Sequence, residues 1–166
     1  VKNALEAYWG DKISDEDLLK VAKEQRLKTY ATIKEQCVDF VPTGTFSLYD
    51  HVLDMSNTLG IIPEAYAKSG LSQLDTYFAM ARGHQKGGVD LPATEMKKWF
   101  DSNYHYLVPE FSEKSEFKLN DNKPVDDFIE AKEAGYNARP VILGPMTLLW
   151  LGKTSKDAQA PNFNRY

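Results

Sequence analysis

Apolar residues recur at spacings of three and four along several segments of the chain, which is the pattern of amphipathic helices. Short apolar runs that stop at Pro or Gly alternate with these segments and indicate β-strands. The pattern predicts helices at residues 2–9, 14–37, 46–59, 72–82, 124–134 and 146–151, and strands at residues 38–41, 104–108 and 141–143. Helices and strands therefore alternate along most of the chain.

Cap residues define where several of these helices begin and end. Ser14 with Asp17, and Ser72 with Asp75, have the three-residue spacing of N-terminal capping boxes. Glycines follow the expected C-terminal ends of three helices: Gly60, Gly83 and Gly135. The stretch from Gly83 to Pro92 is predicted to be a loop.

Alternating strands and helices are typical of parallel βαβ units whose helices cover a sheet. Loops at the carboxyl ends of such strands build the ligand site, so function is expected after Val41, around residues 104–109 and after Leu143. A closed eight-unit barrel needs about 250 residues. The 166-residue chain opens with Val1 and an uncapped helix, so we predict one domain, residues 1–166, that is α/β and part of a (β/α)8 barrel whose start and end are missing.

Composition excludes several classes of function. A formal net charge of -4 gives no global attraction to nucleic acid or anionic membranes, and no stretch approaches the roughly 20 apolar residues of a membrane span. The single Cys37 excludes an internal disulfide and a thiolate metal cluster, and together with the absence of a signal-like segment it indicates the cytoplasm. Cys37 falls on the apolar stripe of the long helix, where a buried, inert thiol is expected.

The segment Glu95-Met-Lys-Lys-Trp-Phe-Asp-Ser-Asn-Tyr-His-Tyr106 has the highest density of chemical groups. Lys97 or Lys98 can pair with carboxylates, Asn103 can donate and accept hydrogen bonds, and the aromatic rings offer stacking faces. These groups suit an extended anionic ligand with a flat ring. An aromatic-rich core strand carrying a solvated lysine pair explains the same residues.

A second cluster, Tyr49-Asp50-His51 with Asp54, lies near the start of an expected helix. An Asp beside a His is compatible with catalysis or metal binding, but adjacent helical residues point about 100° apart. No second ligand stands at a metal-binding spacing from His51. A hydrogen-bonded structural network is therefore favoured. The pair Gly87-Gly88 is isolated in the expected loop and does not indicate nucleotide binding.

Several motifs, in order along the chain, resemble the opening motifs of cobalamin-independent methionine synthases, with a fungal variation. They are Lys2-Asn-Ala-Leu-Glu-Ala-Tyr-Trp9, Phe46-Ser-Leu-Tyr-Asp-His-Val-Leu-Asp54, Leu74-Asp-Thr-Tyr-Phe-Ala-Met-Ala-Arg-Gly83, Met96-Lys-Lys-Trp-Phe-Asp-Ser-Asn-Tyr-His-Tyr-Leu-Val-Pro-Glu110 and Arg139-Pro-Val-Ile-Leu-Gly-Pro145. The resemblance runs over nearly the whole chain.

The resemblance implies a pair of face-to-face (β/α)8 barrels that transfers the methyl group of 5-methyltetrahydrofolate polyglutamate to homocysteine. In that family the catalytic zinc, held by His, two Cys and Glu, and the homocysteine site belong to the second barrel. The present chain would belong to the first barrel and would partner the second. It would hold neither catalytic residues nor metal ligands, and it would be inactive alone.

The first barrel contributes contacts with the folate and its polyglutamate tail. The resemblance places tail-binding groups at Lys2, Lys98 and Asn103, and it favours Lys98 over Lys97. Two rival hypotheses remain: a non-catalytic module that binds folate or another polycarboxylate, and a rigid structural half that closes the cleft.

Overall fold

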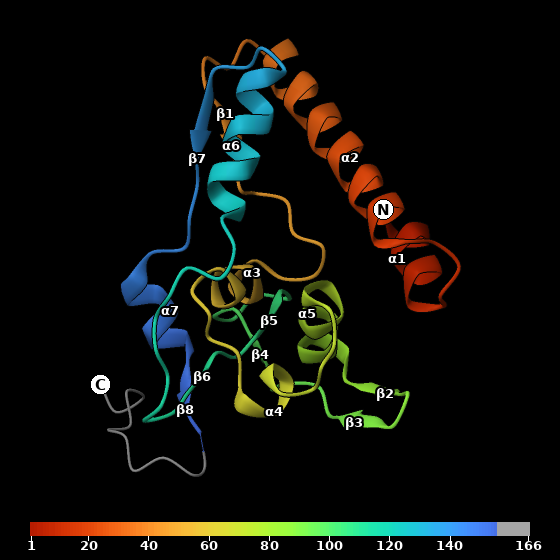
Figure 1. The fold of residues 1–166 in the computed structure, drawn as a ribbon. Coiled ribbons are helices and arrows are strands. Elements are labelled where there is room, and N and C mark those ends of the chain that lie inside the picture. Colours follow the sequence, from red (N-terminus) through yellow and green to blue (C-terminus); the bar gives the residue numbers. More distant parts are fainter. Residues whose placement is uncertain (156–166) are drawn as a thin grey trace. The chain divides into compact units, whose positions relative to one another are not determined.

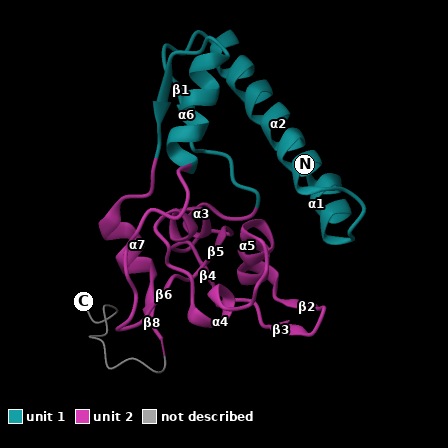
Figure 2. Cartoon of the chain, in the orientation of Figure 1, with its two compact units in different colours: residues 1–48, 123–141 teal, residues 49–122, 142–166 magenta. Residues whose placement is uncertain are grey.

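The computed structural model describes residues 1–155 as a mixture of helices and short strands (Figure 1). The elements fall into two compact units, each made of two separate stretches of chain (Figure 2). Unit 1 comprises Val1–Leu48 and Lys123–Val141, and unit 2 comprises Tyr49–Asn122 and Ile142–Tyr166. Residues 49–122 are thus inserted between the two halves of unit 1.

The elements of unit 1 are α1 (Lys2–Trp9), α2 (Asp15–Glu35), β1 (Val41–Thr43), α6 (Lys123–Glu133) and β7 (Ala138–Pro140). The predicted capping box at the start of α2 is confirmed. Ser14 Oγ accepts a hydrogen bond from the Asp17 N–H at 3.2 Å, and the Asp17 carboxylate accepts one from the Ser14 N–H at 3.3 Å. Ser14 and Asp17 are three residues apart, so the cap forms from local sequence.

Strands β1 and β7 form a parallel pair in which Val41 lies opposite Ala138. The Val41 N–H donates to the Asn137 carbonyl at 2.8 Å, and the Val141 N–H donates to the Thr43 carbonyl at 2.9 Å. Pro42, which has no N–H, lies between these bonding positions and so interrupts no bond to β7. The core of unit 1 gathers around the buried residues Tyr30, Val41 and Ala131.

A charged cluster joins α2 to α6. Arg26 donates to both carboxylate oxygens of Glu130, through Nε at 2.7 Å and through an Nη at 2.8 Å. Lys123 Nζ lies 2.7 Å from the Asp127 carboxylate. Burial acts to lower the pKa of Arg26, but the Glu130 hydrogen bond and the Asp127 charge raise it by more, so the pKa is raised overall. The Arg26 guanidinium therefore stays charged, and its two hydrogen bonds to Glu130 link the two helices.

Unit 2 holds the remaining elements: α3 (His51–Thr58), α4 (Glu64–Ala67), α5 (Gln73–Arg82), β2 (His84–Lys86), β3 (Val89–Leu91), β4 (Met96–Lys98), β5 (His105–Leu107), β6 (Glu110–Phe111), α7 (Pro145–Leu151) and β8 (Lys153–Thr154). Its strands form two antiparallel hairpins, β2–β3 and β4–β5, and one parallel pair, β6–β8. Its core is a cluster of buried apolar residues: Val52, Ile61, Tyr106, Val108, Phe111, Leu148 and Leu151.

Several predicted helix boundaries are wrong. The helix expected from residue 46 begins at His51, because Asp50 is its N-cap and accepts a hydrogen bond from the Leu53 N–H. The long helix ends at Glu35, and Cys37 has a left-handed φ of 61°. Cys37 is therefore exposed rather than buried.

The expected strands also shift. The run at residues 38–41 pairs only from Val41 onward, in β1. The run at residues 141–143 lies beyond β7, which ends at Pro140. Gly44 has a φ of 78°, which turns the chain after β1, so pairing stops opposite Pro140. The strand expected at residues 104–108 is present as β5, but it is antiparallel to its neighbour.

The stretch expected to be a loop contains the β2–β3 hairpin. Gly87 and Gly88 form its two-residue turn, with φ values of 61° and 83°. A turn with positive φ at both central residues matches the twist of the flanking strands. The prediction of a loop from Gly83 to Pro92 is therefore wrong for β2 and β3.

The α/β character of the chain is confirmed at the level of mixed helices and strands. Within residues 1–155 every sheet has two strands, and these strands do not close into a barrel. Two of the four sheets are parallel pairs, β1–β7 and β6–β8. Across the same residues, no helix combines the length and apolar character that a membrane crossing requires.

Candidate functional site

The β4–β5 hairpin of unit 2 presents the segment richest in chemical groups. Its register pairs Lys97 with Tyr106 and Lys98 with His105. The connecting loop is closed by the Trp99 N–H, which donates to the Tyr104 carbonyl at 2.7 Å. Phe100 in this loop has a left-handed φ of 48°, a strained conformation for a residue with a side chain.

Lys98 and Asn103 lie on this one hairpin, and both are exposed. Lys98 is the last residue of β4 and lies opposite His105 of β5. Asn103 lies two residues before His105 in the sequence. The Asn103 carbonyl lies 3.0 Å from Nδ1 of His105, which leaves the side-chain amide of Asn103 out of that contact. The hairpin therefore carries an exposed ammonium group at the end of β4 and an exposed amide in the loop that precedes β5.

Lys97 is in a different electrostatic environment from Lys98. Its Nζ lies 3.5 Å from a Glu95 carboxylate oxygen. Lys153 Nζ lies 2.8 Å from Glu95 and 2.8 Å from Glu110, and the Lys153 hydrogen bond is the largest cause that lowers the pKa of Glu95. Among residues 1–155, Lys98 has no such ion pair. Adjacent strand residues point to opposite faces, so the two ammonium groups cannot replace one another.

Lys2, the remaining predicted site residue, belongs to unit 1. It is the first residue of α1, and its side chain is 86% exposed. Its Nζ lies 3.9 Å from Glu6, an exposed pair one helical turn away that contributes little stability. The ammonium group of Lys2 is therefore accessible to an anion.

Asp50 supports the hairpin from α3. It is 1% exposed, and its Oδ2 accepts hydrogen bonds from the Leu53 N–H at 2.9 Å and the Leu107 N–H at 3.1 Å. Its Oδ1 accepts a hydrogen bond from the Tyr104 hydroxyl. Burial, followed by the Asp50 hydrogen bond, raises the pKa of Tyr104, so the hydroxyl remains a donor. One carboxylate thus joins the start of α3 to β5.

His51 adds aromatic contacts to the same network. Its Nδ1 lies 3.0 Å from the Tyr104 hydroxyl oxygen, and its ring centroid lies 4.9 Å from that of Trp99. In the same network, the Tyr77 hydroxyl donates to Asp54 at 2.7 Å and accepts from the Tyr49 N–H at 3.1 Å. The favoured prediction of a hydrogen-bonded network at Asp50, His51 and Asp54 is confirmed.

The sequence did not indicate that Tyr77 and Tyr104 complete this network. Tyr77 is buried, which is the main reason that its pKa is raised well above the usual value. Tyr77 falls within the helix expected at residues 72–82, and that helical pattern does not indicate a polar partner. A buried tyrosine hydroxyl usually has a hydrogen-bond partner. The presence of a tyrosine in this helix was therefore the one sequence signal for a further member of the network.

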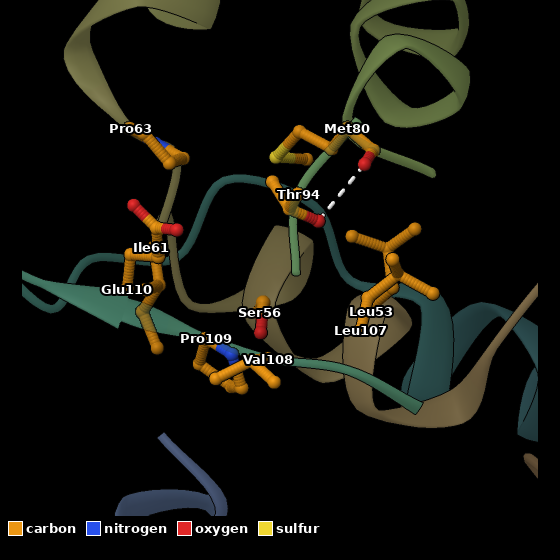
Figure 3. Close-up of a pocket in the computed structure, with 10 residues that line it drawn as sticks. All are labelled: Leu53, Ser56, Ile61, Pro63, Met80, Thr94, Leu107, Val108, Pro109 and Glu110. Atoms are coloured by element: carbon orange, nitrogen blue, oxygen red, sulfur yellow. Dashed lines mark hydrogen bonds between the residues drawn. The ribbon is translucent and has the colours of Figure 1, made fainter. Parts of the chain in front are cut away.

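A small cavity lies elsewhere in unit 2 (Figure 3). Its volume of about 10 Å³ is room for about one water molecule. The Thr94 hydroxyl at its edge donates to the Met80 carbonyl at 2.8 Å, and the Ser56 hydroxyl donates to the Val52 carbonyl at 2.9 Å. The cavity is too small for a folate ring or a glutamate, so the exposed hairpin is the better candidate site.

Metal ligands are not grouped in the part of the chain that the structure describes. Within residues 1–155, no three His, Cys, Asp or Glu side chains converge on a possible metal position. Cys37 is exposed in unit 1, and the whole sequence holds one Cys and three His. These residues do not fit a catalytic zinc site, which takes three protein ligands.

Comparison with known proteins gives consistent matches. A Schizosaccharomyces pombe protein named "Probable 5-methyltetrahydropteroyltriglutamate--homocysteine methyltransferase" is 52% identical over 162 residues, 94% of this chain and 21% of that protein. The Saccharomyces cerevisiae 5-methyltetrahydropteroyltriglutamate--homocysteine methyltransferase is 50% identical over 164 residues, 95% of this chain and 21% of that protein. The Chelativorans protein of the same name is 49% identical over 163 residues, 92% of this chain and 21% of that protein.

The chain thus spans about a fifth of the length of these relatives. The family model described as "Cobalamin-independent synthase, N-terminal domain" matches residues 1–165, nearly the whole chain. The resemblance identified from the sequence motifs is confirmed, and the chain belongs to the N-terminal domain family of the cobalamin-independent synthases.

Proposed function

We propose that this chain is part of a methyltransferase that moves the methyl group of 5-methyltetrahydropteroyltriglutamate to homocysteine in methionine biosynthesis. Its family membership carries the proposal, since the matched relatives bear the name of that reaction. The chain contributes part of a first (β/α)8 barrel, which partners a second barrel of the same cytoplasmic protein. Its own residues bind the folate tail.

The exposed groups of the β4–β5 hairpin support the tail-binding role. A triglutamate tail is extended and carries several carboxylates at neutral pH. The Lys98 ammonium supplies a positive charge, and the Asn103 amide supplies a donor. In unit 1, Lys2 carries an exposed ammonium on α1 that we also propose to bind the tail. These residues bind and orient the substrate and do not touch the reacting methyl group.

Zinc belongs to the remainder of the proposed enzyme and not to this chain. When bound, zinc lowers the pKa of a coordinated thiol, so that the homocysteine sulfur is a thiolate at neutral pH. The described residues offer no converging ligands for it. The thiolate must therefore be generated outside the residues described here.

A preparation of the 166-residue chain should contain no stoichiometric zinc, because the sequence holds one Cys and three His and the described ones do not converge. The measurement is elemental analysis by mass spectrometry after dialysis against a weak chelator. One zinc per chain that survives dialysis would contradict the assignment of the metal to another part of the enzyme.

In the complete synthase that carries this chain, Lys98→Ala should raise KM for the triglutamate substrate by a few fold to tens of fold. An exposed ammonium–carboxylate contact contributes about 0.2 to 1 kcal/mol, and more when partly desolvated. The tail lies away from the reacting methyl, so the loss of binding free energy should raise KM and leave kcat unchanged. The monoglutamate substrate should be nearly unaffected, and added salt should narrow the difference between wild type and variant.

Lys97→Ala is the matched control, because Lys97 is the neighbouring lysine on the opposite face and pairs with Glu95. Steady-state kinetics with both substrates compares the two variants. A tail-dependent defect in Lys97→Ala, with none in Lys98→Ala, would reverse the residue assignment.

A further inference from the structure

The two candidate tail-binding residues of the hairpin are each followed directly by an anchored aromatic residue. Trp99 follows Lys98, and its ring packs against His51 at 4.9 Å. Tyr104 follows Asn103, and its hydroxyl donates to the buried Asp50 carboxylate. Asp50 and His51 are the N-cap and first residue of α3. The start of one helix therefore holds both arms of the hairpin loop.

These anchors act on a loop that is otherwise exposed. Residues 100–103 are exposed, and Phe100 is in the left-handed region at a φ of 48°. Ser102 stabilises the turn, because its hydroxyl donates to the Trp99 carbonyl at 2.5 Å and accepts from the Tyr104 N–H at 3.2 Å. Every one of these local bonds ends on Trp99 or Tyr104, so the loop takes its orientation from those two residues.

We propose that Tyr104, Asp50 and His51 are positioning residues for the polyglutamate tail, which they influence through Lys98 and Asn103 without touching it. The inference rests on the proposed tail-binding function. A loop that is fixed before binding loses less conformational entropy when the tail binds, so its affinity for the tail is higher. The Asp50–Tyr104 hydrogen bond spans 54 residues of sequence, so it is a tertiary contact and not a local feature of the turn.

Tyr104→Phe is the direct test, since it removes the hydroxyl and keeps the ring. In the complete synthase we expect KM for the triglutamate substrate to rise about threefold to tenfold. We expect kcat and the KM for the monoglutamate substrate to remain unchanged. His51→Ala is a second variant that acts on the Trp99 arm, and the same selective rise is expected.

Tyr66→Phe is the matched control. Tyr66 belongs to unit 2, as Tyr104 does, and its hydroxyl likewise donates to one acceptor, the Pro92 carbonyl at 2.5 Å, outside the hairpin loop. This variant loses one tyrosine hydrogen bond, as Tyr104→Phe does, but it should leave the ratio of the two KM values unchanged. A general loss of stability would affect both tyrosine variants and both substrates alike.

A double-mutant cycle separates positioning from direct contact. If Tyr104 acts only through Lys98 and Asn103, adding Tyr104→Phe to a Lys98→Ala, Asn103→Ala background should cause no further tail-dependent rise in KM. A further rise of the same size in that background overturns the inference. So does an equal effect of Tyr104→Phe on both substrates. An absent effect of Lys98→Ala would instead remove the proposed function, and the positioning role with it.

Discussion

Asp50→Ala should lower the free energy of unfolding by about 2 to 4 kcal/mol, the sum of a lost helix cap of about 1 kcal/mol and one buried N–H left unsatisfied at about 1 to 3 kcal/mol. The Asp50 carboxylate accepts two backbone N–H groups, from Leu53 and Leu107, and the Tyr104 hydroxyl. The Leu107 N–H is buried and would have no replacement acceptor from an alanine. Urea unfolding followed by circular dichroism and Trp fluorescence measures the loss.

Asp50→Asn is the control for this prediction, because the amide oxygen can take the place of Oδ2 and accept both backbone bonds. Its amide nitrogen would then face the Tyr104 oxygen and donate to it. We expect a cost of only about 1 kcal/mol. Equal destabilisation by Ala and Asn would show that the backbone bonds are not the source of the stability.

The 166-residue chain alone should form no methionine above the uncatalysed rate. The proposed reaction needs a thiolate at neutral pH, and a free thiol with a pKa near that of cysteine, about 8.5, is mostly protonated there. The described residues do not converge on a metal that would generate the thiolate. The assay measures methionine formed from homocysteine and 5-methyltetrahydropteroyltriglutamate.

The complete synthase, assayed under the same conditions, is the positive control. Zinc is added to the isolated chain in a parallel reaction. This reaction tests whether inactivity results from loss of metal during purification. Zinc-dependent turnover by the chain alone would place the chemistry within these residues and would contradict the proposed division of the enzyme.

Local features of the fold could be predicted from the sequence. Ser72 caps α5 by accepting a hydrogen bond from the Asp75 N–H at 3.0 Å, as the spacing predicted. The helix ends at Arg82 before Gly83, which has a φ of 77°. Such signals succeed because both partners lie within one turn of helix.

Which residues form strands, and with which register, could not be predicted, because both depend on the partner strand. Val141 and Ile142 have the composition of a buried strand, yet they are 50% and 60% exposed in the described structure. The β2–β3 hairpin was missed because its strands are largely polar and exposed, so the apolar alternation that marks a half-buried strand is absent. The Gly87-Gly88 pair was the remaining signal for it.

The sequence motifs located the candidate site. The contacts that hold its hairpin in place could be identified only from the structure. Lys98 and Asn103 follow from the resemblance and remain predictions as ligand contacts. Asp50 was correctly assigned to a hydrogen-bonded network, but its partner Tyr104 stands 54 positions away. Periodicity carries no information about contacts at that separation.

The discontinuity of unit 1 has a consequence for the order of events during synthesis. Arg26 pairs with Glu130, which is added 104 positions later. A ribosome that adds about 5 to 20 residues per second needs roughly 5 to 20 s to cover that interval. Throughout this time the face of α2 around Tyr30 lacks Ala131, its core partner from α6. Unit 1 can therefore complete its core only after the inserted residues 49–122 have been made, and slower translation of that insert would lengthen the exposure of this apolar face to aggregation.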